Sequence, residues 1–153
     1  MIQRIQSIWL LLAAMSISCL LFLPIATTTD VIGMKFYILA SGLYQELAGV
    51  KKQVDSFLPL LISTIAVAIM CFANIFNYKK RKLQKQMIYV SIVFIIGLSF
   101  WCSVYAKEIP GGLDTANYDT GMYLPPLAIA FCLLAIRGIN RDEALLKSAD
   151  RLR

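Results

Sequence analysis

A strongly basic segment separates two long apolar runs in the middle of the chain. Residues 77–86 hold five lysines and arginines, whereas the flanking residues 57–76 and 87–106 carry no charge. Each run has the length that crosses the ~30 Å hydrocarbon layer of a membrane. A short polar turn between two such runs is typical of a transmembrane hairpin, and a turn rich in Lys and Arg stays in the cytoplasm. The segment therefore predicts the orientation of the whole chain.

Two further apolar runs complete the predicted membrane domain. They cover residues 5–25 and 123–139, so we expect one domain with four spans, outer loops at 26–56 and 107–122, and a cytoplasmic tail at 140–153. The first run resembles a signal peptide, but it is longer than the 7–15 apolar residues of a signal sequence, and we interpret it as a retained helix. An apolar content of 59% and a mean hydropathy of +0.70 agree with a membrane protein.

The distribution of Lys and Arg supports this topology. The eleven on the predicted inner side are Arg4, Lys79, Lys80, Arg81, Lys82, Lys85, Arg137, Arg141, Lys147, Arg151 and Arg153. The four on the predicted outer side are Lys35, Lys51, Lys52 and Lys107. Both termini are therefore expected in the cytoplasm. This asymmetry also explains the net charge of +6 without nucleic acid as a partner.

The first outer loop is too long to be an unstructured link, so we expect structure within it. Residues 34–39 are rich in β-branched and aromatic side chains, and Gly33 and Gly42 offer turns on either side, which favours a short strand or hairpin. We expect a helical turn to follow at residues 44–48. A helical interpretation remains open, because four apolar side chains share one helical face. They are Phe36, Leu39, Leu43 and Leu47.

The tail has the pattern of an α-helix that continues from the fourth apolar run. Glu143 precedes Lys147 by four residues, and Leu145, Ala149 and Leu152 form a narrow apolar stripe. Three uses of the stripe remain open: packing on the chain's own helices and basic turn, lying on the inner leaflet, or binding another membrane or cytoplasmic protein. The candidate contacts to a partner or to anionic lipid headgroups are Lys79, Lys80, Arg81, Lys82, Lys85, Arg141, Leu145, Lys147, Arg151 and Leu152.

Residues that support catalysis or ion transport are sparse. The four predicted spans hold no acidic residue, and the chain has no His to activate a nucleophile or bind a metal. The cysteines fall one in each run, at Cys19, Cys71, Cys102 and Cys132, and are interpreted as small buried apolar residues. Four polar residues within the spans are expected to bond between helices: Ser63, Thr64, Asn74 and Ser91. We expect no enzyme activity, cofactor or metal.

Several stretches together resemble a domain-of-unknown-function family of small four-span inner-membrane proteins from Bacteroidota. They are residues 1–14, Gly42-Leu43-Tyr44, the segment 80–84 and the tail 137–153. The resemblance implies a bacterial inner-membrane location and four helices, and it brings no catalytic residue. The plan is also similar to that of claudins, which suggests that the outer loops join in a small sheet, although the paired loop cysteines of claudins are absent.

These observations predict an all-α, four-helix transmembrane bundle with a small outer cap that includes a short β-hairpin. The first functional hypothesis is a non-enzymatic accessory or scaffold subunit of a bacterial inner-membrane assembly. The alternative is a small lipid or metabolite transporter or flippase-like protein that uses a groove of Ser, Thr and Asn side chains.

Overall fold

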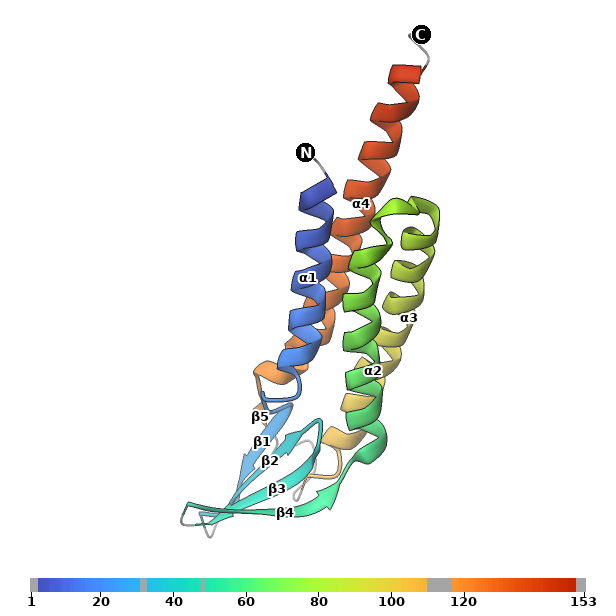
Figure 1. The fold of residues 1–153 in the computed structure, drawn as a ribbon. Helices are drawn as coiled ribbons and strands as arrows, with labels where there is room; N and C mark the ends of the chain where they lie inside the picture. The colour runs from blue at the N-terminus through green and yellow to red at the C-terminus, as the bar shows by residue number, and fades with distance from the viewer. Residues whose placement is uncertain (1–2, 31–32, 48, 110–116, 151–153) are drawn as a thin grey trace.

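The described residues fold into four long helices and one antiparallel sheet (Figure 1). The computed structural model describes residues 3–30, 33–47, 49–109 and 117–150. The long helices are α1 (Gln3–Cys19), α2 (Leu58–Ile75), α3 (Arg81–Ala106) and α4 (Leu124–Asp150), and the short 3-10 helices are η1 (Phe76–Lys79) and η2 (Thr120–Tyr123). The strands are β1 (Ala26–Thr29), β2 (Lys35–Leu39), β3 (Gly42–Leu47), β4 (Val50–Ser56) and β5 (Asn117–Tyr118).

The prediction of an all-α fold is wrong, because the two loops predicted to lie outside contribute to a five-stranded antiparallel sheet in the order β4-β3-β2-β1-β5. The strand predicted at residues 34–39 is present as β2, where it forms a hairpin with β3, and the sheet extends well beyond this hairpin. The helical turn expected at residues 44–48 is also wrong over its described part, since β3 continues through Leu47 and Tyr44 pairs with Tyr37. Ala48 lies outside the described residues.

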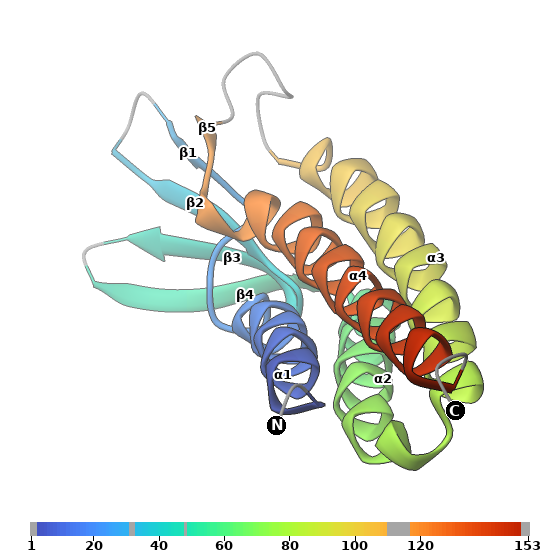
Figure 2. The same ribbon diagram turned by 90° about the horizontal axis from the view of Figure 1, so that it is seen from above.

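The helices pack side by side in a closed order, in which α1 and α3 each contact both α2 and α4 (Figure 2). Small side chains let α1 approach α4 closely, since Ala13, Cys132 and Ala135 are fully buried in one core cluster. By length and composition, three helices of the described chain could cross a membrane: α2, α3 and the helical stretch Thr120–Leu145. The apolar part of α1, Gln6–Cys19, is shorter.

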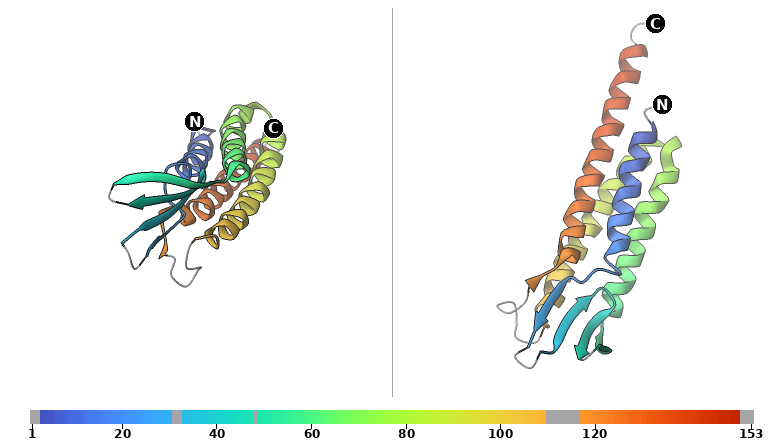
Figure 3. Two further views of the ribbon diagram at one scale, coloured as in Figure 1. Left: turned by 90° about the horizontal axis from the view of Figure 1, so that it is seen from below. Right: turned by 90° about the vertical axis from the view of Figure 1, so that its left-hand side faces the viewer.

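The sheet packs with one face against the end of the helices that lies opposite the two termini (Figure 3). Ala26, Ile38 and Leu43 are buried there in a second core cluster, against side chains such as Leu60 and Leu98. Alternation along each strand places their neighbours on the other face. This alternation explains why the segment forms strands and not the helix that the sequence left open. A strand in β2 or β3 buries one face against the helices and leaves the other face open.

The short strand β5 joins the two outer loops. It pairs antiparallel with β1, with Ala26 opposite Tyr118 and Thr27 opposite Asn117. Gly121, in η2, allows the chain to pass this close, because a Cβ at this position would lie 2.5 Å from the Pro24 carbonyl oxygen. The sheet is therefore built from both outer segments, as the claudin-like plan suggests.

Two helix boundaries differ from the predicted runs. Helix α1 ends at Cys19, because the chain turns at Leu20–Pro24 to enter β1. Helix α3 begins at Arg81, so most of the basic segment lies in the first turns of a helix and only η1 and Lys80 form the turn. Helix α4 continues without a break to Asp150, which is the continuation that the tail pattern predicts.

Candidate functional site

The basic segment and the tail meet at the end of the helices that carries both termini. The ammonium group of Lys85 on α3 lies 3.0 Å from the carboxylate of Glu143 on α4, and the two side chains are 24% and 31% exposed. This contact holds the tail against the basic segment. Up to Glu143, therefore, the tail packs on the chain's own helices.

Among the other predicted contact residues whose side chains the structure describes, all but Arg81 are exposed. Lys80, Lys82 and Arg141 are exposed, and Arg81 is half-buried. Leu145 is 51% exposed, and the C-terminal part of α4 extends beyond α1 and the α2–α3 turn (Figure 1). Lys79 and Lys147 lie in η1 and α4, but their side chains are outside the described set, as are residues 151–153 with Arg151 and Leu152.

Replacing Glu143 with glutamine should lower the melting temperature by about 1–2 °C, because a partly exposed ion pair contributes only ~0.5 kcal/mol. The effect should shrink at high salt. Thermal unfolding in mild detergent at two salt concentrations measures it, with Arg141→Gln as a control that leaves the Lys85–Glu143 pair intact. A loss above 5 °C, or one unaffected by salt, would contradict an exposed ion pair.

Two buried polar contacts lie at the same end, and of their four residues the sequence patterns indicated only Asn74 as a partner between helices. The side-chain amide of Gln6 on α1 donates a hydrogen bond to Oδ2 of Asp142 on α4, and the two residues are only 6% and 7% exposed. The side chains of Asn74 and Gln84 each donate to the other's backbone carbonyl oxygen at 3.4 Å, which joins α2 to α3. Oδ1 of Asn74 and Oδ1 of Asp142 are buried without a partner among the described residues.

Only part of the prediction for the polar residues within the spans is correct. Asn74 bonds between helices, but Ser63 and Thr64 donate to the carbonyl of Leu60 in their own helix, as hydroxyl groups in apolar helices often do. Ser91 likewise donates to Met87. The interpretation of the cysteines fits Cys71, Cys102 and Cys132, which are buried, and is wrong for the exposed Cys19.

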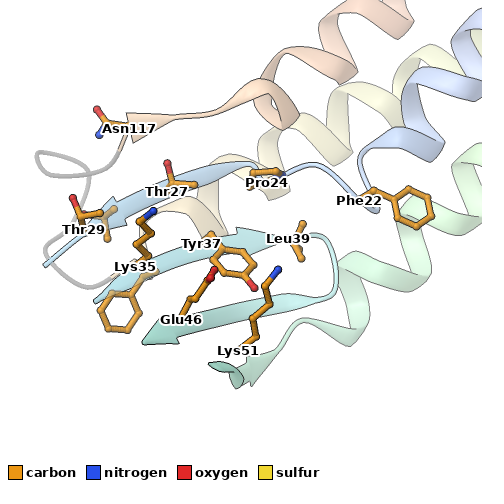
Figure 4. A pocket seen from close by; sticks show the side chains of 12 residues that line it. Phe22, Pro24, Thr27, Thr29, Lys35, Tyr37, Leu39, Glu46, Lys51 and Asn117 are labelled. Atoms are coloured by element: carbon orange, nitrogen blue, oxygen red, sulfur yellow. The ribbon is translucent and has the colours of Figure 1, made fainter. Parts of the chain in front are cut away.

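The open face of the sheet contains a pocket of about 550 Å³ (Figure 4). Its lining changes character along the strands. Phe22, Pro24 and Leu39 form the end near the helices, whereas Lys35 and Glu46 lie toward the far end of the strands, and the ammonium group of Lys51 reaches back over the Tyr37 ring. The remaining lining residues are Thr27, Thr28, Thr29, Phe36, Tyr37 and Asn117. The sequence hypotheses did not include this site, because cross-strand register brings its residues together.

A second, apolar cavity of about 350 Å³ lies between α1 and α2. Leu11, Met15 and Ser18 line it from α1, and Ile69 and Phe72 from α2. Met15 and Ile69 are 55% and 63% exposed, so the cavity is an open groove on the outside of the helices. Its lining is almost wholly apolar, which suits a hydrocarbon chain better than a polar solute.

The fold and these surfaces define a helical protein with membrane-length apolar segments and a sheet at one end. Over residues 2–152 the chain matches the model of the family described as Domain of unknown function (DUF4293), and it belongs to that family. The recognition of a domain-of-unknown-function family is therefore confirmed. A comparison with curated proteins found no match.

Proposed function

We propose that this protein is a non-enzymatic, integral accessory or scaffold subunit of an assembly in the bacterial inner membrane. One observation carries the proposal: the C-terminal end of α4 extends past the other helices, and Leu145, five residues before the end of α4, is 51% exposed. A projecting helix with an exposed apolar side chain beside cations fits the groove of a partner protein. The exposed cations Lys80, Lys82 and Arg141, which lie on the η1–α3 segment and on α4 at the same end of the molecule, suit acidic groups on that partner or anionic headgroups at the inner face.

The proposal places the chain in the membrane as a multi-pass protein with both termini in the cytoplasm. The charge-free α2, the long α3 and the apolar part of α4 support membrane insertion. The excess of Lys and Arg at the end with the termini supports the orientation. An origin in Bacteroidota belongs to the same proposal and rests on the sequence resemblance alone.

Truncation after Ala144 should release the partner while the remaining helices stay folded. A cut after Asn140 would also remove Asp142 and Glu143, and with them the contacts to Gln6 and Lys85. The shorter truncation spares both contacts and removes only the projecting part of α4. The measurement is affinity purification of the tagged full-length and truncated proteins from their own membrane, followed by mass spectrometry of bound proteins.

Leu145→Ser tests the same surface with one side chain, and Ala144→Ser is its matched control at the preceding exposed position. We expect Leu145→Ser to reduce partner recovery at least fivefold and Ala144→Ser to leave it within twofold. Unchanged thermal unfolding shows that both variants are folded. Full recovery of every partner by the truncated protein would overturn the role proposed for α4.

A lipid or metabolite transporter is the second candidate, and the groove between α1 and α2 is the observation that favours it. In that case the purified protein should be stabilised by its substrate, and Ile69→Asn in the groove should abolish the effect. Asn74 is no part of the groove, since its amide is bonded to Gln84. Flat unfolding curves across a panel of lipids and metabolites would count against transport.

A further inference from the structure

The pocket on the open face of the sheet is apolar near the helices and charged farther along the strands. A lipid changes in the same way from its acyl chains to its headgroup. Leu39 and Lys35 are four residues apart on β2, which is ~13 Å along the strand. The interfacial layer of a membrane leaflet is roughly 5–8 Å thick. Because the strands run obliquely from the ends of the helices (Figure 1), the cationic end of the pocket can lie at headgroup depth while its apolar end lies nearer the hydrocarbon.

The pocket is also on the lipid-facing side of the helices. The sheet extends sideways past α1, so that seen along the helices it is not hidden behind them (Figure 2). Leu11, Met15, Ser18 and Phe22 are spaced by four, three and four residues, which places them along one side of α1 and the turn after it. The first three line the groove between α1 and α2, and Phe22 lines the pocket.

The charged side chains of the pocket favour a negatively charged headgroup. Lys35, Glu46 and Lys51 are cross-strand neighbours on three adjacent strands, so two ammonium groups flank one carboxylate and leave one net positive charge. The Lys51 ammonium is held 5.7 Å from the centre of the Tyr37 ring. Hydroxyl groups of Thr27 and Thr29 add hydrogen-bonding capacity on the same face. An anionic phosphate ester that carries hydroxyl groups complements this lining.

We propose that the pocket binds the headgroup of an anionic glycerophospholipid of the outer leaflet, with an acyl chain along α1 in the groove that α1 forms with α2. The ammonium groups of Lys35 and Lys51, on either side of Glu46, contact the phosphate from above the strands. This inference rests on the proposed membrane placement but is independent of the accessory role of α4. A partner lost on truncation of α4 and a lipid lost on substitution of the sheet are separate results.

The test is a calorimetric titration. Short-chain phosphatidylglycerol is added to the delipidated full-length protein in mild detergent, and the heat of binding gives the affinity. Lys35→Gln/Lys51→Gln should weaken binding roughly tenfold, because each cation near a headgroup contributes a severalfold effect. Lys52→Gln is the matched control, since it removes the same charge from the opposite face of β4, and it should change affinity less than twofold. Equal losses of affinity in the control and in the double variant would overturn the proposal that this pocket binds the headgroup.

Three further binding measurements identify the chemical class of the ligand. Glu46→Gln should tighten binding of phosphatidylglycerol, and a loss of affinity would overturn the anionic assignment in favour of an amine-bearing headgroup. Phosphatidylcholine of the same chain length should bind at least fivefold more weakly. Inorganic phosphate at the same concentrations should give no signal, and binding as tight as that of the lipid would overturn a lipid site. The three lysines are exposed, so unchanged thermal unfolding of their variants is expected.

Discussion

Gly42→Ala should destabilise the protein by on the order of 3 kcal/mol, the largest effect that we expect from a single added methyl group. Gly42 begins β3 with a φ of 153°, a backbone conformation that side-chain-bearing residues rarely adopt. A Cβ at this position would collide with the backbone carbonyl oxygen of Asp55 on β4, which has no freedom to move aside as a flexible side chain would. The substitution therefore adds strain and separates two paired strands next to the core.

Gly33→Ala is the matched control for the Gly42 experiment. Gly33 also has a positive φ, at 80°, but a Cβ there would meet nothing within 4 Å. Gly33→Ala should lower the free energy of unfolding by only about 1 kcal/mol, because the backbone conformation alone is strained. Thermal unfolding in mild detergent, with hydrogen exchange of the β3 and β4 amides, measures both. Equal effects of the two substitutions would show that the contact with Asp55 does not limit stability.

Gln6→Ala should lower the free energy of unfolding by about 2 kcal/mol. The substitution leaves the Asp142 carboxyl group buried and without its hydrogen-bond donor, and an unsatisfied buried polar group costs ~1–3 kcal/mol. The double variant Gln6→Leu/Asp142→Leu should recover most of the loss, because replacing both partners by apolar groups leaves nothing unsatisfied. The double variant is therefore expected to be more stable than the single one.

Equilibrium unfolding of the wild type, Gln6→Leu, Asp142→Leu and the double variant measures the coupling between Gln6 and Asp142. Additive effects would show that the two side chains contribute independently. Gly138 provides a separate check on the same contact, since a Cβ there would lie 3.1 Å from Cγ of Gln6. We expect Gly138→Ala to lower stability by about 1 kcal/mol, as α4 is pushed away from α1.

Local patterns predicted the helices because length and composition suffice for them. The charge-free runs correspond to α2 and to most of α3, and the tail periodicity correctly extended α4. The boundary at Cys19 could not be read in the same way, because the apolar run continues through Ile25 although the chain has already turned toward the sheet. Apolar residues at that end are buried against the sheet instead of continuing a helix.

The extent of the sheet required more than local patterns. β4 has the sequence Val-Lys-Lys-Gln-Val-Asp-Ser and exposes every residue, so it carries no alternation of apolar and polar side chains. It is a strand because its backbone pairs with β3. β5 has only two residues and is defined by its pairing with β1. In both cases the partner strand supplies the signal.

The sequence by itself determined most of the apolar helices, the strand β2, the cationic residues at the end with the termini, and the family. Only the tertiary structure decided that Gln6 and Asp142 are buried together, although 136 residues separate them. It likewise decided that Lys35, Glu46 and Lys51 share one pocket. The physical reason is that helix formation depends on neighbours within a few turns, whereas burial and pairing depend on which distant surfaces the packed helices and strands bring into contact.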